Sequence, residues 1–313
     1  MSEKKKIFMD INIDGDCTNL GALAVLNVLK NLGEAEIIGT TACFQSPLAT
    51  GCIKAINSYY GNGELPVGIL HRQEETHPTP FMKPVNEKFR PEFPDGEDAP
   101  DTVDVMRKVL SEQEDESVIL VVTGCFASVE ALLKSGADEY SPLSGQELAE
   151  RKISSIFAMA GAFPTFGEDE HFGENNIIVQ IPAAKYVTQH WKKELVLSAY
   201  EIGIRTRSLF EFSYHGSEDH PLKMMYYIHN GGSNTQGNPS WDHTAVLDAV
   251  RPGKYFDRHE YGDIEVTDEG VTVWHKKEGG KHSYLLPKVP FDDVAAEIND
   301  MIFPEWRKIK ANG

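Results

Sequence analysis

Oxygen-bearing side chains crowd the segment IFMDINIDGDCTNLGALAVL, which runs from Ile7 to Leu26. These side chains are Asp10, Asn12, Asp14, Asp16, Thr18 and Asn19. Hard divalent cations such as Ca²⁺ take carboxylate and amide oxygens at this kind of spacing as their ligands. Helix capping by Thr18 or Asn19 and a turn at Asp14-Gly15 would explain several of the same residues without a metal. The segment is therefore a candidate metal site, with a well-capped helix as the alternative.

The elements that position this segment alternate between strand and helix. Residues 6–13 are predicted to form a buried strand, and apolar residues at helical spacing follow in residues 20–32. The alternation continues with strands predicted at 36–42, 65–70, 117–122, 153–160 and 195–198. Helices are predicted at 48–60, 101–113 and 182–191, and another helix follows the strand at 117–122 and ends at residue 133. Such alternation is typical of parallel βαβ units. The sequence thus predicts an α/β fold with a doubly wound, mainly parallel sheet flanked by helices.

Less regular stretches complete a single predicted domain over residues 1–313. Prolines and charged residues dominate residues 71–100, which favours a long loop or lid. Residues 263–286 alternate like a β-hairpin, and a helix is predicted at 291–302. A C-terminal hairpin plus helix is therefore expected over residues 263–302.

Polar residues follow several of the predicted strands. Residues 10–16, Thr123-Gly124, Ala160-Gly161 and the loop at 174–176 all come after a strand. In an open parallel sheet, ligands bind at the carboxyl ends of the strands. We therefore expect these segments to meet at one edge of the sheet, although they lie far apart in the sequence.

The overall charge restricts the class of partner. The 313 residues carry a net charge of −18, from 30 basic and 48 acidic residues, and no cluster of Lys and Arg stands out. Binding to a phosphate backbone needs such a cluster, which argues against nucleic-acid polymers and anionic membranes as partners. No apolar run approaches the roughly 20 residues that a membrane span needs. A small molecule is the expected partner.

The four cysteines, Cys17, Cys43, Cys52 and Cys125, form no C-x-x-C pair. Their spacing argues against a zinc knuckle, and four cysteines in so long a chain do not make a disulfide scaffold. Reduced thiols and a cytoplasmic location are the simpler prediction, with Cys17 as a small buried side chain.

An ordered series of segments resembles the inosine-uridine preferring nucleoside hydrolases. A variant of that family's first motif reads D-T-D-I-G-x-D-x-D-D-A-G-A-L, and DINIDGDCTNLGAL keeps six of its residues: Asp10, Ile13, Asp16, Gly21, Ala22 and Leu23. The resemblance continues in the family's order through GEAEIIGTTA, AINSYYG, LPVGIL, MAGAF, ENNIIVQIPAAKYV, LSAYEIG and SWDHTAVLDAV. Each segment is weak by itself, but the ordered set covers most of the chain.

The resemblance implies an N-glycosidase. In that family, a calcium ion at the bottom of the pocket holds the ribose diol and a water molecule. An aspartate takes a proton from this water, which attacks the anomeric carbon of the nucleoside. Calcium suits this chemistry because a hard cation binds oxygen ligands and lowers the pKa of bound water. Family members also form dimers or tetramers, so a homo-oligomer is expected by analogy.

Several positions depart from the family's pattern. Asn12 stands at the position of the second aspartate, which is both calcium ligand and general base, and Thr18-Asn19 replaces the Asp-Asp pair. Ala127 stands where a threonine offers its backbone carbonyl to the metal. Among the matching positions, Asp242 is the late metal ligand, and Glu174 and Asn176 correspond to ribose contacts. Trp241 replaces a histidine that lies near the leaving base.

These correspondences define the predicted site. Its catalytic positions are Asn12, as the substituted base position, Asp10 and Asp16; its substrate-binding positions are Glu174, Asn176, Thr18 and Trp241; and its metal-binding positions are Asp242, Asn12, Asn19, the Ala127 carbonyl and Asp14 as a stand-in.

The substitutions remove charge from the family's metal site. Three carboxylates become one, Asp242, and calcium affinity falls steeply with the number of charged ligands. An amide at Asn12 also cannot take a proton from water near neutral pH. Asp14 or Asp16 would have to turn inward to supply the missing charge. We favour loss of this charge over such a replacement. Calcium is therefore expected to bind weakly or not at all.

Two functions follow from the sequence. The first is hydrolysis of the N-glycosidic bond of ribonucleosides or related N-ribosides, with impaired or altered metal-dependent catalysis. The second is a non-catalytic protein of the same fold that binds a nucleoside or sugar. A phosphatase of the haloacid dehalogenase type, which FMDINIDGD resembles locally, is disfavoured because Asn12 replaces its required second aspartate.

Overall fold

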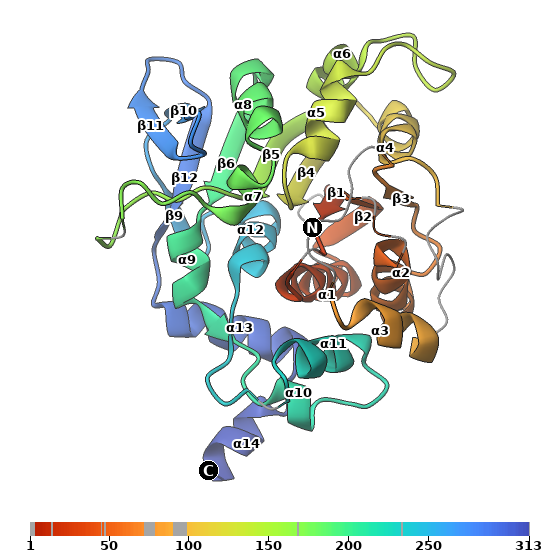
Figure 1. The fold of residues 1–313 in the computed structure, drawn as a ribbon, viewed down its shortest axis with the longest axis vertical. Coiled ribbons are helices and arrows are strands. Elements are labelled where there is room, and N and C mark those ends of the chain that lie inside the picture. Colours follow the sequence, from red (N-terminus) through yellow and green to blue (C-terminus); the bar gives the residue numbers. More distant parts are fainter. Residues whose placement is uncertain are drawn as a thin grey trace.

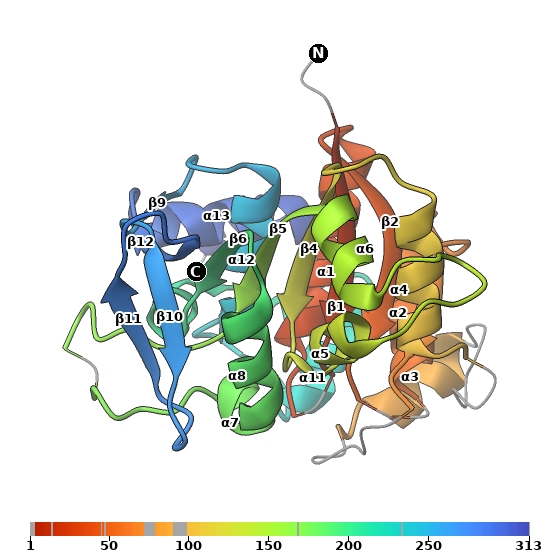
Figure 2. The same ribbon diagram turned by 90° about the horizontal axis from the view of Figure 1, so that it is seen from above.

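A computed structural model describes residues 4–13, 15–44, 46, 48–71, 79–89, 99–167, 169–232 and 234–312. It contains a central sheet with helices on both faces (Figures 1 and 2). In these ranges, no helix is both long and apolar enough to cross a membrane.

The central sheet has ten strands, in the order β11-β10-β12-β6-β5-β4-β1-β2-β3, with β9 paired to β12. Their bounds are β1 Lys5–Ile11, β2 Ala35–Ala42, β3 Val67–Ile69, β4 Val118–Thr123, β5 Ile153–Met159, β6 Glu194–Ser198, β9 Phe256–Arg258, β10 Gly262–Val266, β11 Thr272–Lys276 and β12 His282–Pro287. Every pair from β12 to β3 along this order is parallel, and β9, β10 and β11 pair antiparallel at one end. The predicted doubly wound, mainly parallel sheet is confirmed.

Helices pack on each face of the sheet, and the strand sequences are apolar on both sides for this reason. In β1, Ile7, Met9 and Ile11 pack into one apolar cluster, whereas Phe8 packs into the other. Successive side chains of a strand point to opposite faces, which produces this division. The helices on the first face are α1 Thr18–Asn31, α2 Ala49–Tyr59, α11 Pro221–His229, α12 Trp241–Val250 and α13 Phe291–Ile302. Those on the second face are α4 Thr102–Ser111, α5 Ala127–Lys134, α6 Gly145–Lys152 and α8 Ile181–His190.

Short elements join these layers. They are α3 Met82–Phe89, α7 Asn175–Ile178, α9 Tyr200–Arg205, α10 Phe212–His215 and α14 Trp306–Asn312, with a two-stranded sheet of β7 Arg207–Ser208 and β8 Asn238–Pro239. The α3 helix lies inside the segment for which we predicted an irregular loop. It is stabilised because the Asn86 amide donates to the carbonyls of Met82 and Leu48 while Val85 is buried. The rest of that predicted loop, at 72–78 and 90–98, falls outside the described residues.

Close packing of α1 against α11 and α12 sets the relative position of the polar residues at their ends. Gly21 makes this possible, since a Cβ atom there would lie 2.5 Å from the Tyr226 hydroxyl and would also overlap the His243 ring. This packing places the first turn of α1 beside the first turn of α12, so that Thr18 and Asp242 lie in contact although 224 residues separate them.

Candidate functional site

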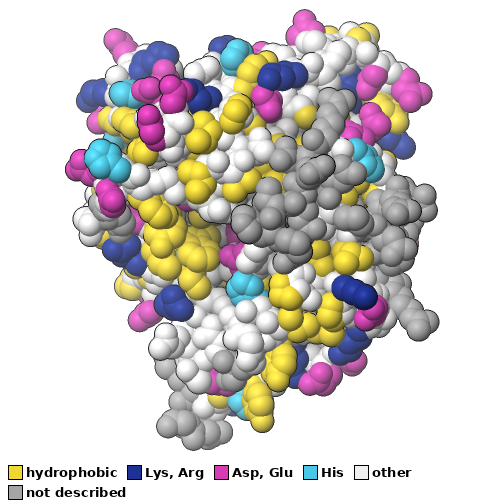
Figure 3. Space-filling model, in the orientation of Figure 1, with side chains coloured by type: hydrophobic (Ala, Val, Ile, Leu, Met, Phe, Trp, Pro, Cys, Tyr) yellow, Lys and Arg dark blue, Asp and Glu magenta, His cyan; other side chains and the backbone are white. Residues whose placement is uncertain are grey.

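A cavity of about 400 Å³ opens at the carboxyl ends of β1 and β5, beneath the first turns of α1, α7, α9 and α12. Its lining residues are Asn12, Gly15, Asp16, Asn19, Met159, Phe172, Glu174, Asn175, Asn176, Tyr200, Trp241 and Asp242. The molecular surface shows acidic side chains at the bottom of a hollow that a patch of hydrophobic side chains borders (Figure 3). The cavity volume is within the range of about 300–1,000 Å³ that is usual for small-molecule sites.

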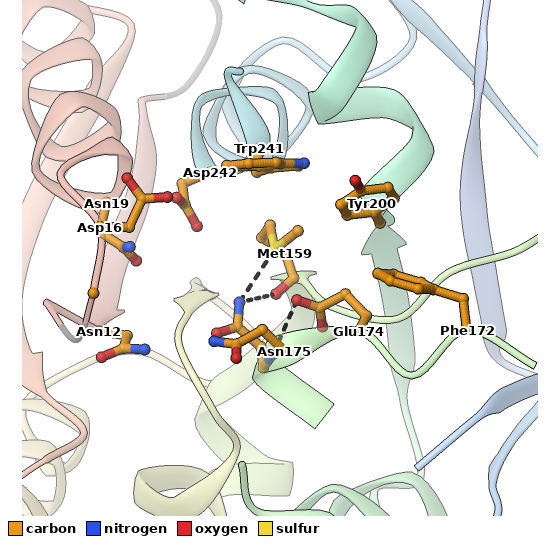
Figure 4. A pocket seen from close by; sticks show the side chains of 12 residues that line it. Asn12, Asp16, Asn19, Met159, Phe172, Glu174, Asn175, Tyr200, Trp241 and Asp242 are labelled. Atoms are coloured by element: carbon orange, nitrogen blue, oxygen red, sulfur yellow. Dashed lines mark hydrogen bonds between the residues drawn. The ribbon is translucent and has the colours of Figure 1, made fainter. Parts of the chain in front are cut away.

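Two carboxylates face each other on the polar side of the cavity, those of Asp16 and Asp242 (Figure 4). Asp16 Oδ1 accepts hydrogen bonds from the backbone N–H groups of Cys17, at 2.5 Å, and Thr18, at 2.9 Å. The Thr18 hydroxyl donates to Asp242 Oδ2 at 2.6 Å. Thr18 and Asn19 are thus the first residues inside α1 rather than its caps, and the Thr18 side chain contacts α12 instead of its own helix.

Negative charge is poorly compensated at this end of the cavity. Burial raises the pKa of Asp242 well above its ordinary value, and the charge of Asp16 raises it further. Asp242 Oδ1 and Asn19 Oδ1 are both buried and have no hydrogen-bond partner. Two carboxylates and an unpartnered amide oxygen make a donor set that suits a hard divalent cation. A bound cation or a proton would relieve the repulsion between the two acids.

Two other predicted positions, Asp10 and Ala127, do not line the cavity. Asp10 is fully buried in β1, where it accepts a hydrogen bond from Thr41 at 2.7 Å, and it does not line the cavity. Burial raises the pKa of Asp10 to about 7. Ala127 is the first residue of α5 and packs in a separate apolar cluster with Cys43 and Cys125. Asp14 falls outside the described residues.

Glu174 and Asn176 form the base of the cavity. Glu174 caps α7, since Oε1 accepts from the Asn176 N–H at 2.9 Å and Oε2 accepts from the Gly161 N–H at 3.0 Å. The Asn176 amide donates to the Met159 carbonyl at 2.9 Å, at the end of β5. These bonds join the loop after β5 to the sheet, so both residues support the cavity as well as line it.

The stability of the fold is expected to depend on the ionisation of Glu174. Burial raises its pKa from 4.5 to about 7, although hydrogen bonds from backbone N–H groups oppose the shift. Between these pH values, the Glu174 carboxyl group is protonated in the folded chain and ionised in the unfolded chain. Its contribution therefore makes the free energy of unfolding fall as the pH rises from about 4.5 to 7. In Glu174→Gln, we expect a shallower fall over this range, measured by urea unfolding at several pH values.

Glu147→Gln is the control for this effect. The exposed carboxylate of Glu147 bonds to Ser144 in the capping box of α6, which lowers its pKa below 4.5. A lowered pKa contributes stability that is lost as the pH falls, so this variant should change the pH profile only below about 4.5 and with the opposite sign. Equal slopes above pH 4.5 for Glu174→Gln and the unmodified chain would contradict the prediction.

An aromatic wall, formed by Phe172, Tyr200 and Trp241, runs from beside Asp242 to the far side of the cavity (Figure 4). The ring centroids of Phe172 and Tyr200 are 4.7 Å apart, and those of Tyr200 and Trp241 are 5.9 Å apart with the rings 26° from parallel. Gly203 allows Trp241 to approach α9 closely, because a Cβ atom at that position would overlap the Trp241 backbone and ring. Only Trp241 of the three was predicted from the sequence.

Comparison with known proteins identifies the fold. No family model matches the sequence, and no curated protein matches it. Solved structures do match over nearly their whole length. An inosine-guanosine nucleoside hydrolase aligns with a TM-score of 0.71 and 17% identity, covering 95% of this chain and 98% of that chain. The chain has the nucleoside hydrolase fold.

Other structures of the nucleoside hydrolase fold agree. A purine-preferring ribonucleoside hydrolase from Gardnerella vaginalis aligns with a TM-score of 0.69 and 17% identity, covering 95% of this chain and 99% of that chain. The type III effector protein XopQ, in complex with adenosine diphosphate ribose, aligns with a TM-score of 0.68 and 13% identity, covering 96% and 94% of the two chains. The nucleoside hydrolase-like fold that the sequence motifs suggested is therefore confirmed.

Proposed function

We propose that this chain binds a ribonucleoside or a related N-riboside in the cavity and hydrolyses its N-glycosidic bond. The observation that carries the proposal is that one cavity has a carboxylate end, at Asp16 and Asp242, and an aromatic end, at Phe172 and Tyr200, with the Trp241 ring between them. Sugar hydroxyl groups suit the first end, and a planar base suits the second because aromatic rings stack on each other. This arrangement would place the glycosidic bond near the centre of the cavity.

A divalent cation would bind at the carboxylate end. We expect Asp16 and Asp242 to supply its charged ligands and the Asn19 amide oxygen to supply a neutral one. A bound calcium ion would supply charge to orient the sugar diol and to acidify a water molecule. The sequence alone suggested a single carboxylate, whereas Asp16 facing the cavity makes two. We therefore propose weakened rather than absent cation binding.

The proton of the attacking water needs an acceptor on this chain. Asn12 lines the cavity but, as an amide, cannot serve. The Asp16 carboxylate is the candidate, because two backbone N–H groups hold Oδ1 and fix the orientation of the whole group toward the cavity. The water would give a proton to Asp16 as the water oxygen bonds to the anomeric carbon. The base would leave with the electron pair of the glycosidic bond and take a proton from solvent. Turnover should be slow, because one side chain must serve both the ion and the proton.

The alternative is a protein of the same fold that binds a riboside without cleaving it. Asn12 at the base position favours this reading over an efficient enzyme. The adenosine diphosphate ribose complex of XopQ adds that molecule to the candidate ligands.

One set of measurements tests both readings. Ribose release from purine nucleosides, pyrimidine nucleosides and adenosine diphosphate ribose would be followed with Ca²⁺ and with a chelator, and binding would be followed by calorimetry. Turnover that the chelator abolishes supports the hydrolase. Saturable binding of a riboside without turnover supports the alternative. The absence of both would refute the assignment of this cavity to ribosides.

The aromatic wall yields a prediction about binding of the nucleobase. Phe172→Ala is expected to weaken nucleoside binding by about 5-fold or more, since stacking on a base is worth about 1–3 kcal/mol. Affinity for free ribose should not change. Phe166→Ala is a matched control, because Phe166 lies in the same loop and is 40% exposed against 36% for Phe172, but does not line the cavity. Equal effects of the two variants in calorimetry would remove Phe172 from the ligand site.

A further inference from the structure

A second group of metal-binding side chains lies beside the cavity, on the side of α11. Donor atoms of Asp16, Cys17 and His229 all lie within 4.8 Å of one another, the one such group of three in the part of the chain that the structure describes. We propose that these three residues bind a zinc-class transition-metal ion. The proposal concerns their own geometry and does not depend on riboside hydrolysis.

The donor types decide the class of ion. One carboxylate oxygen, one sulfur and one imidazole nitrogen suit Zn²⁺ or Co²⁺, whereas Ca²⁺ binds oxygen ligands. Tetrahedral zinc with bonds of about 2.0–2.3 Å holds its ligands about 3.3–3.8 Å apart. The separations here therefore need to shrink by about 1.5 Å at most, to which rotation of the exposed His229 side chain can contribute. Binding would replace the proton of the Cys17 thiol, which leaves to solvent.

The surrounding packing holds the three donors together. Asp16 and Cys17 directly precede α1, and His229 is the last residue of α11, which packs beside α1. One turn earlier on α11, the Tyr226 hydroxyl is fully buried and has no hydrogen-bond partner. This hydroxyl lies against the first turn of α1, since a Cβ atom at Gly21, one turn after Cys17, would come within 2.5 Å of it. An unpartnered polar atom beside three metal-binding donors is a second, independent sign of a missing ligand.

Sharing of Asp16 links this site to the cavity. The same carboxylate also faces Asp242, where we propose the hard cation. An ion bound to Cys17 and His229 would draw Asp16 away from that position. Zinc is therefore expected to weaken Ca²⁺ binding, and the two ions would compete through a single side chain.

The test is cobalt titration of the full, metal-free chain, because Co²⁺ reports its ligands in its spectrum. We expect a near-ultraviolet sulfur-to-cobalt charge-transfer band that one equivalent of Zn²⁺ removes. Cys17→Ser should abolish the band, and His229→Ala should weaken cobalt affinity at least 10-fold. His215→Ala is the matched control for the effect of His229→Ala on cobalt affinity, since His215 is also exposed and is also the last residue of its helix. Cys52→Ser, at another buried free thiol, should leave the spectrum unchanged.

Two results would overturn the proposal. The first is the absence of a charge-transfer band in the unmodified chain. The second is a band that survives Cys17→Ser but is lost in Cys43→Ser, which would move the ion to Cys43 and Cys125, whose sulfur atoms are 3.8 Å apart. If Cys17→Ser does not fold, His229→Ala still decides, because its side chain is exposed. No riboside is present in these measurements, so their failure would leave the proposed function standing.

Discussion

Asp242→Asn is expected to weaken Ca²⁺ and riboside binding by on the order of 100-fold, while thermal stability is retained or increased. The affinity falls because one of the two proposed charged ligands is lost, and calcium affinity depends steeply on ligand charge. Stability does not fall, because a buried acid that Asp16 repels becomes a neutral amide that can still accept from Thr18. Calorimetric titration and thermal unfolding of the same preparations would measure both effects.

Asp248→Asn provides the matched control in the same helix. Asp248 is also buried, but it accepts hydrogen bonds from the Gly253 N–H at 3.1 Å and from Arg258 at 3.3 Å. Weakening a charged hydrogen bond costs about 1.5–3 kcal/mol, so this variant should lose stability and keep its ligand affinity. If Asp242→Asn behaved like Asp248→Asn in both measurements, Asp242 would be a structural residue of α12 and the proposed cation site would fail.

The architecture was predictable because it depends on periodicity that the sequence displays directly. The apolar runs of β1 and β4 and the helical spacing in α1 identify parallel βαβ units. The rule that ligands bind at the carboxyl ends of such strands then brings distant segments together. The structure places residues from two of these segments in one cavity, namely Asn12 and Asp16 from the first and Glu174 and Asn176 from the loop at 174–176, together with Asp242 from α12.

The direction of the Asp16 side chain was not predictable from spacing. It depends on the turn before α1, where Gly15 has a positive φ of 75°, a conformation that glycine adopts without steric cost. The turn brings Asp16 over the helix start, where two N–H groups bind it. Counting residues along the family motif gave one carboxylate at the proposed cation position, whereas this local geometry gives two facing each other.

Other features of the structure had only a weak signal in the sequence, or none. Tyr200 lies two residues after the end of β6, so the rule for strand ends would have included it. Phe172 lies in an irregular loop, and no sequence pattern distinguishes it from Phe166. Helix α6 was missed although its start has the S-x-x-E sequence of a capping box, at Ser144 and Glu147. These cases differ because capping is a local interaction, whereas the aromatic wall is formed by tertiary packing.

Asn12→Asp is expected to raise the rate of riboside hydrolysis by about 10²–10⁴-fold, the usual contribution of a positioned general base. The side chain already lines the cavity at the end of β1 and is 3% exposed, so the new carboxylate would replace an amide of nearly the same shape. It would also give the proposed cation a third charged ligand and so strengthen calcium binding. Restoring an acid at Thr18 instead would remove the hydroxyl that donates to Asp242 and add a charge beside it.

Asn175→Asp separates the effect of a general base on the hydrolysis rate from the effect of added negative charge in the cavity. Asn175 lines the same cavity, is exposed, and lies next to Glu174 at the start of α7. It should leave turnover within a few-fold of the unmodified chain. Only Asn12→Asp should add an acidic limb to the pH–rate profile, in which the rate rises as the new carboxyl group loses its proton, because a base acts only in its unprotonated form.

A rate increase of the same size in both variants would mean that cavity charge, and not proton transfer at residue 12, limits the reaction. No increase in either variant, with calcium bound, would favour a riboside-binding protein whose loss of activity extends beyond the base position.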